Sequence, residues 1–188
     1  MRLDHIAYRV RDRIEAAKFI CDAFGYRISD EFTIDFGNGE YAKSFALEPP
    51  EKKDEEARFS INIWGNALVP GAIGNSYSSV YHIAPEIFIS DGTPNSVVGR
   101  WVEKHGPQIH HLAYSVDDVA ETMEVWKQRG WATFTTDKPI SNSNDLVQCF
   151  TNPHPLTGIV YEFIKRGGDN KGFNKDNVRQ LMISSDNK

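Results

Sequence analysis

The stretch 109-IHHLAYSVDDV-119 has a close counterpart near the N-terminus, 3-LDHIAYRVRDR-13. Both contain the pattern His-x-Ala-Tyr-x-Val-x-Asp. When His5 is aligned with His111, the two stretches also match at alanine, tyrosine, valine and aspartate. Self-similarity of this kind indicates that the chain consists of two copies of one structural unit.

Each copy opens as an apolar strand and continues into a helix. Asp12 and Asp118 are each followed three residues later by a glutamate, which resembles the capping box that begins helices. Alternating or continuous apolar patterns then predict strands, and Asn38-Gly39 predicts a hairpin turn between the first two of them. The predicted strands are 31–36, 41–47, 58–64 and 80–90 in the first copy and 131–136, 146–151 and 158–165 in the second.

These elements predict an α+β fold made of two tandem βαβββ modules that form a shared cleft. The first module is expected at residues 1–90 and the second at 107–166, with a linker helix within 91–106. Residues 167–188 are expected to form a C-terminal helix and tail, because their apolar positions recur with helical spacing.

Composition narrows the classes of function. The chain has 188 residues, 40% of them hydrophobic, and a net charge of −5 without a dominant basic patch, which argues against nucleic acid as a partner. No apolar run reaches membrane-spanning length and no signal peptide is visible, so a cytoplasmic protein is expected. Cys21 and Cys149 lie in apolar-patterned segments and are expected to be buried free thiols. The expected partner is a small organic molecule, and a homodimer is left open.

The repeat also predicts a metal site. Equivalent strands of two such modules flank one cleft, so His5 and His111 should point into the same cavity. Glu162 is the one charged residue inside the apolar run 159-IVYEFI-164, and a carboxylate there needs a partner or a metal ion. Glu86 is expected to be its counterpart in the first module, with His82 as a rival on the same face. His110 should face away from the cleft by strand alternation.

This donor set leaves the chemistry open. Two histidines and one carboxylate with free positions are typical of Fe(II) sites that activate O2. If Glu86 is a fourth ligand, Ni, Co, Zn or Mn used as a Lewis acid is also expected. The simpler alternative is that each histidine is structural and that Glu162 forms an ordinary ion pair.

At these residues the chain resembles the vicinal oxygen chelate superfamily, which is built from paired βαβββ modules. It is most similar to the catalytic C-terminal half of 4-hydroxyphenylpyruvate dioxygenase. The resemblance implies that His5, His111 and Glu162 bind iron. It also implies that Gln148, in 146-LVQCF-150, faces the substrate.

The tail is the most specific part of this resemblance. Residues 172-GFNKDNVRQLM-182 resemble the family's C-terminal gating helix, whose leading aromatic residue, here Phe173, packs over the substrate. The resemblance implies an Fe(II) dioxygenase that oxidises a chelating 2-oxo acid or a related small organic acid.

Two other families within the superfamily are alternatives. The chain also resembles methylmalonyl-CoA epimerase and glyoxalase I, which implies a lyase or isomerase in which Glu86 binds the metal or acts as a base. The carboxylate that the epimerase uses as a base aligns with Ser44, which departs from that pattern. A third reading, a bleomycin-resistance-like protein that binds a ligand without catalysis, does not account for the two histidines and Glu162.

Overall fold

The computed structural model describes residues 1–50, 84–141, 146–167 and 174–186. The predicted strand 58–64, the beginning of the predicted strand 80–90, His82 and Phe173 lie outside these residues.

The described chain forms one eight-stranded sheet in the order β2-β3-β4-β1-β5-β8-β7-β6. Its first half contains β1 (Arg2–Arg9), α1 (Arg13–Phe24), β2 (Arg27–Gly37), β3 (Glu40–Glu48) and β4 (Glu86–Gly92). Helix α4 (Val97–His105) follows. The second half contains β5 (Gln108–Ser115), α5 (Val119–Gln128), β6 (Ile140–Ser141), β7 (Leu146–Phe150) and β8 (Val160–Arg166), and α6 (Lys175–Asp186) ends the described chain.

Both halves have the same topology. The first strand of each half pairs in parallel with the last strand, β1 with β4 and β5 with β8, and the middle strands add to the outside. The halves join where β1 and β5 pair antiparallel. The predicted α+β class, the tandem βαβββ order and the C-terminal helix are therefore confirmed.

Individual residues explain where helices α1 and α5 begin and where the chain turns between β2 and β3. The Asp12 carboxylate accepts hydrogen bonds from the Ile14 and Glu15 amides, and the Asp118 carboxylate accepts one from the Glu121 amide, so both aspartates cap their helices as predicted. The predicted hairpin turn joins β2 to β3, and Asn38 adopts a positive φ of 56° there.

One predicted strand is wrong. Residues 131–136 form only an isolated bridge, between Phe134 and Thr151, and the edge strand β6 comes later and is two residues long. Pro139 lies between the bridge and β6. Because proline has no amide hydrogen for a ladder, it helps to explain why the pairing is interrupted.

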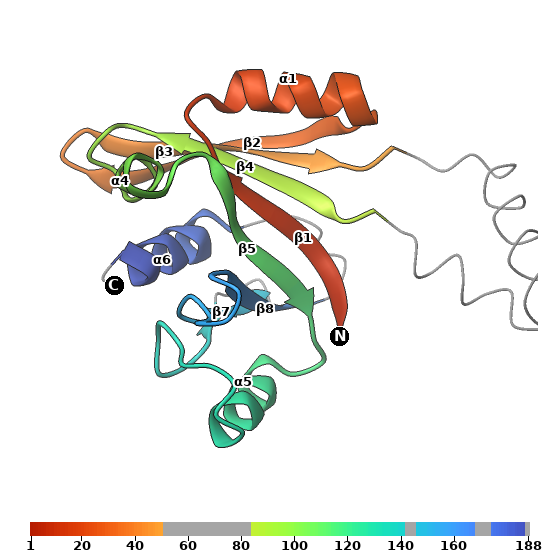
Figure 1. The fold of residues 1–188 in the computed structure, drawn as a ribbon, viewed down its shortest axis with the longest axis vertical. Helices are drawn as coiled ribbons and strands as arrows, with labels where there is room; N and C mark the ends of the chain where they lie inside the picture. The colour runs from red at the N-terminus through yellow and green to blue at the C-terminus, as the bar shows by residue number, and fades with distance from the viewer. Residues whose placement is uncertain (51–83, 142–145, 168–173, 187–188) are drawn as a thin grey trace, which may run out of the picture.

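The helices cover different faces of the curled sheet (Figure 1). Helices α1 and α5 lie on its outer side, whereas α6 lies inside the curve between the two halves. The inner side of α6 packs into both halves, since Val178 and Met182 join a cluster with Phe32 and Phe88, and Leu181 joins one with Phe150 and Val160. Residues of the central strands and of α6 line one cavity, among them His5, Phe88 and Leu181.

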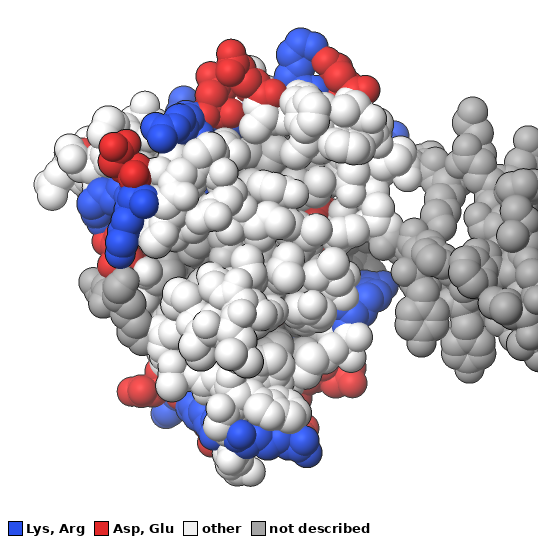
Figure 2. All heavy atoms as spheres, viewed as in Figure 1, with Lys and Arg blue, Asp and Glu red and all other residues white. Residues whose placement is uncertain are grey.

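The surface carries charges of both signs side by side. On the face shown in Figure 2, acidic and basic side chains mix near α1 and α5, and a largely uncharged region lies between them. Among the described residues, no helix is both long enough and apolar enough to cross a membrane. Both cysteines are free thiols; Cys149 is buried as predicted, but Cys21 is only half-buried.

Packing of α6 can be tested by truncating its buried face. Leu181 is 3% exposed, so Leu181→Ala should lower the free energy of unfolding by about 2–4 kcal/mol through lost contacts and the cavity left behind. Ile183 on the same helix is 38% exposed, and Ile183→Ala should cost less than about 1 kcal/mol. Denaturant unfolding would measure both. Equal effects would show that α6 is not part of the cooperative fold.

Candidate metal centre

Three donor atoms converge at the junction of the two halves. His5 comes from β1, His111 from β5 and Glu162 from β8, and all three are buried. The Nε2 atoms of the two histidines lie 3.3 Å apart, and Glu162 Oε2 lies 3.3 Å from His5 Nε2 and 3.1 Å from His111 Nε2. Among the described residues these three form the one cluster whose donors could hold a metal ion. The structure therefore brings together the predicted ligands His5, His111 and Glu162.

The triangle has the size that a transition-metal ion requires. Ligands about 2.1 Å from one ion lie about 3.0 Å apart at right angles and about 3.4 Å apart at tetrahedral angles. The three observed distances fall within this range. Two imidazoles and one carboxylate also form a common donor set for divalent first-row metals. The residues present thus fit a metal ion.

Other side chains hold each donor in orientation. His5 Nδ1 lies 2.8 Å from Asp4 Oδ1, and that carboxylate also accepts a hydrogen bond from Arg166. The Gln148 amide donates to Glu162 Oε1 over 2.6 Å. Contacts of this kind set the tautomer and ring orientation of metal-binding histidines and leave the facing atoms for the ion.

The orientation of His111 depends on a bulge that the sequence analysis missed. Along the β1–β5 ladder, Ala7 pairs with His111 but Tyr8 pairs with Ile109, which leaves His110 as an extra residue on β5. A bulge breaks the alternation of side chains. The prediction that His110 faces away from the cleft is therefore wrong: it lines the same cavity, and its Nδ1 lies 2.8 Å from Nδ1 of His111.

A second bulge occupies the matching place in the first half. Leu3 pairs with Tyr114 and His5 with Ala113, so Asp4 is the extra residue on β1. In both halves the residue before the ligand histidine is displaced, and its side chain contacts Nδ1 of that histidine. The repeat thus extends to the residues that orient the ligands.

Electrostatics favour an ion pair between His5 and Glu162. Burial alone lowers the pKa of His5, but the charge of Glu162 and hydrogen bonds to Asp4 and Glu162 raise it to about 9. Burial raises the pKa of Glu162, and the two neighbouring imidazoles lower it below its ordinary value. Burial lowers the pKa of His111 despite its contact with Glu162. Near neutral pH His5 is therefore a charged imidazolium beside the Glu162 carboxylate, and His111 is neutral.

Glu86 does not match Glu162, which corrects the expected pairing of the two carboxylates. In the second half Glu162 pairs with Ala113, whose repeat counterpart is Ala7. Ala7 pairs with Phe88, whereas Glu86 pairs with His5, two residues earlier. The place of a fourth ligand is therefore taken by the Phe88 ring. Glu86 is half-buried at the start of β4, and burial raises its pKa.

The remaining predicted site residue that the structure describes is Gln148. It lines the cavity, but its amide nitrogen donates to Glu162 and its amide oxygen accepts from Asn177 on α6. In this arrangement Gln148 orients Glu162. Direct contact between Gln148 and a substrate stays a prediction, as does the role of Phe173.

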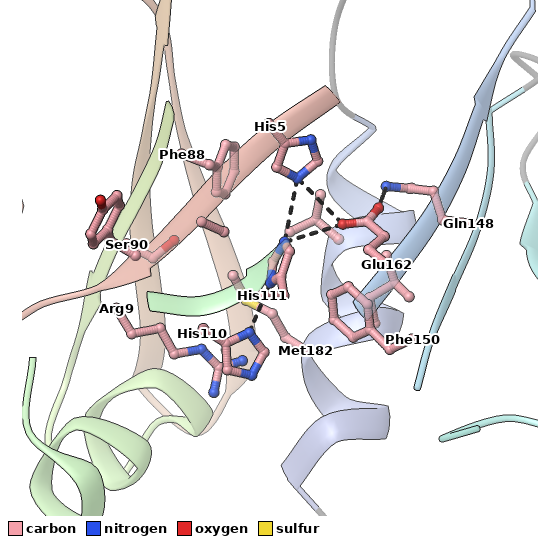
Figure 3. Close-up of a pocket in the computed structure, with 14 residues that line it drawn as sticks. His5, Arg9, Phe88, Ser90, His110, His111, Gln148, Phe150, Glu162 and Met182 are labelled. Atoms are coloured by element: carbon pink, nitrogen blue, oxygen red, sulfur yellow. Dashed lines mark hydrogen bonds and ion pairs between the residues drawn. The ribbon is translucent and has the colours of Figure 1, made fainter. Parts of the chain in front are cut away.

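A cavity extends from the three donors between the sheet and α6 (Figure 3). Its wall includes several residues that the sequence analysis did not single out, among them Arg9 and Ser90. Arg9 lies four residues after His5 on the same strand face, and this spacing is the one signal that could have identified it. The apolar side chains lining the cavity are Ala7, Phe88, Phe150, Val178, Leu181 and Met182.

Comparison with known proteins agrees with the fold. The family model of the glyoxalase/bleomycin resistance protein/dioxygenase superfamily matches residues 4–150. The chain belongs to this superfamily. No curated protein sequence matches it.

Solved structures of members of different chemistry share the fold. A mutant of 4-hydroxymandelate synthase from Streptomyces coelicolor superposes with a TM-score of 0.69 at 17% identity, covering 97% of this chain and 52% of the synthase chain. A methylmalonyl-CoA epimerase superposes with a TM-score of 0.60 at 20% identity, covering 89% of this chain and 97% of the epimerase. A methylmalonyl-CoA epimerase from Mycobacterium tuberculosis has a TM-score of 0.60 at 18% identity, with 89% of each chain covered. At these identities the likeness concerns the fold.

Substitutions should distinguish the side chains that bind the metal from the residues that lie near them. His5→Ala should lower affinity for a divalent metal at least about 100-fold and leave the protein folded, since it removes a ligand. Asp4→Asn should lower affinity about 10- to 100-fold, because His5 loses the carboxylate that orients it. Glu86→Ala is the matched control and should keep the metal. Equilibrium dialysis with elemental analysis would measure all three, and metal loss in Glu86→Ala would restore Glu86 as a ligand.

The proton on His5 predicts a pH dependence. A metal ion must displace that proton, so binding at about pH 7.5 should release about one proton per ion. Affinity should rise about tenfold per pH unit as the pH approaches 9 and level off above it, because His5 is then already neutral. Calorimetry in buffers with different ionisation enthalpies would count the protons. Binding that is independent of pH across this range would contradict the ion pair.

Proposed function

We propose that the protein is a mononuclear Fe(II)-dependent dioxygenase that oxidises a chelating 2-oxo acid or a related small organic acid with O2. The observation that carries the proposal is that the described residues bring together three donors, His5, His111 and Glu162, with Phe88 at the position where a fourth would lie. An Fe(II) ion in such a site would supply three open positions and the capacity to activate O2.

The number of protein ligands distinguishes the two main candidate chemistries. With four protein ligands an octahedral ion retains two open positions, enough for a chelating substrate but not also for O2. With three protein ligands the ion retains three open positions, so that a chelating substrate and O2 can bind together. Because Phe88 has no donor atom and lies against His5, with ring centroids 6.2 Å apart, this wall of the site supports the three-ligand arrangement.

The chain's own residues position the substrate and exclude water. Helix α6 covers the cavity with apolar side chains, including Leu181 and Met182. Phe150 lies against the His111 ring, with centroids 4.7 Å apart, and closes the side toward β7. Gln148 keeps Glu162 oriented by its hydrogen bond. These contacts favour a dry, preorganised site, which oxidation of a bound organic acid requires.

A lyase or isomerase needs a group that moves a proton between carbon atoms. Among the described residues that line the cavity, the one carboxylate is Glu162, which is already assigned to the metal. Ser44, at the position of the epimerase base, is fully buried, and its hydroxyl lies 2.8 Å from that of Ser90. Among the described residues, the lining thus has no carboxylate besides the metal ligand, which supports the oxygenase over an isomerase that uses a carboxylate base, as the epimerase does.

Oxygen consumption tests the proposal directly. The Fe(II)-loaded protein should consume O2 and release CO2 with members of a panel of 2-oxo acids that includes pyruvate, 2-oxoglutarate and phenylpyruvate. Glu162→Ala should reduce the rate at least about 100-fold, because it removes a ligand, whereas Glu86→Ala should change it less than about threefold. An oxygen electrode and headspace CO2 analysis would measure both.

The same proteins loaded with Ni(II) and given hemithioacetals test the alternative. No isomerisation is expected. If no O2 is consumed with any 2-oxo acid, and Ni(II)-dependent isomerisation is present and lost in Glu86→Ala, the protein is a lyase or isomerase instead.

A further inference from the structure

Arg9 is a buried cation in the wall of the cavity. It is 3% exposed and lies on β1 two residues beyond Ala7, on the strand face that carries His5. Figure 3 shows its guanidinium beside His110, at the end of the cavity away from His5 and Glu162. The cavity therefore has a metal-binding end and a cationic end.

Within the described residues, protein groups contact only some of the N–H donors of this guanidinium. Its Nη2 donates to the Ser185 hydroxyl over 3.2 Å, and the group lies over the Trp101 ring, 5.4 Å from its centroid. Within the described residues no carboxylate lies at ion-pair distance from Arg9. Asp186 is the acidic group that favours its charge, but that carboxylate pairs with Arg100.

A buried charge without a counter-ion is costly. Burial lowers the pKa of Arg9 to about 9, which still leaves it charged near neutral pH. Guanidinium has five N–H donors in a planar fork, and one hydroxyl acceptor and one ring leave donors for another group. Function is a common reason why a protein retains such a group at a cavity wall.

The described cavity residues beside Arg9, Ser90 and His110, are polar but carry no negative charge. Ser90 on β4 pairs directly with Arg9 across the sheet and is 2% exposed. His110 contributes an imidazole to the same end of the cavity. Between the two ends, the wall is apolar, with Ala7 and Phe88 on the sheet side. A fitting ligand thus has a chelating head, an apolar middle and an acceptor at its far end.

We infer that Arg9 forms an anion subsite, and that the substrate is a 2-oxo acid with a second carboxylate at the far end of its carbon chain. The inference rests on the proposed function only for the head group, which the metal would hold. A carboxylate suits this end because its planar pair of oxygens matches the guanidinium fork. Within the described part of the cavity Arg9 is the one arginine or lysine, and one cation matches one carboxylate better than a phosphate dianion.

Binding of matched ligands to the wild-type protein tests the subsite without any variant. Fe(II)-loaded protein under nitrogen would be titrated calorimetrically with 2-oxoglutarate, 2-oxoadipate and 2-oxopimelate. Each would be compared with the 2-oxo monocarboxylate of the same chain length. At the length that spans the cavity, the diacid should bind about 10- to 100-fold more tightly than the monoacid, the usual effect of a charge-assisted hydrogen-bonded pair. Equal affinities at all three lengths would overturn the subsite.

Two variants then assign the preference to Arg9. Arg9→Lys keeps the charge and should retain part of the preference, whereas Arg9→Met keeps much of the packing against Trp101 and should abolish it. Affinity for the monoacids should change less than about threefold in either variant. Metal content and thermal unfolding would be measured alongside. A diacid preference that persists in folded Arg9→Met would show that Arg9 only supports the fold.

The outcomes separate this inference from the proposed function. A diacid preference that depends on Arg9, without O2 uptake, would establish the subsite and reject the dioxygenase. Rapid O2 uptake with monoacids, without any diacid preference, would support the dioxygenase and reject the subsite.

Discussion

A carboxylate inside a sheet must be compensated, and the arrangement around Glu162 follows from that constraint. Its side chain is almost fully buried, where an isolated charge would cost several kcal/mol. His5 and His111 face one of its oxygens, and the Gln148 amide donates to the other. Each of these residues comes from a different strand, so the compensation forms only when both halves of the sheet have assembled.

The twofold repeat supplies the histidines, but the two halves have diverged where the chemistry needs asymmetry. The same position of the last strand holds Glu162 in the second half and Phe88 in the first. A carboxylate at both places would add a second negative charge to a buried cluster, together with a fourth ligand. The phenyl ring instead leaves that side of the metal site apolar and free of donors. The second half thus supplies the third ligand, Glu162, and the first half supplies Phe88 as an apolar wall of the metal site.

Several features could be predicted from the sequence because they depend on local pattern. The repeated motif located His5 and His111, the apolar run around Glu162 marked a carboxylate in need of partners, and the capping aspartates marked both helices. Features set by strand register could not be predicted in the same way. Displacing one residue in a bulge turned His110 into the cavity, and a shift of two positions replaced Glu86 by Phe88. Such shifts leave little trace in alternation of apolar and polar residues. Arg9 was missed because its burial becomes visible only once α4 and α6 are in place.

Helix α6 is tied to the site by polar contacts as well as by apolar packing. Asn177 is 1% exposed, and its amide nitrogen donates to the backbone oxygen of Leu146 and to the Gln148 side chain, each over 3.1 Å. Gln148 in turn holds Glu162. If the helix leaves the sheet, the Gln148 amide oxygen loses the hydrogen bond that Asn177 donates to it, and the Gln148 side chain becomes free to rotate. Glu162 then loses the fixed hydrogen-bond donor that Gln148 provides. Docking of α6 therefore does more than exclude water from the cavity. It completes the chain of hydrogen bonds that orients Glu162, the one carboxylate ligand among the three residues of the metal site.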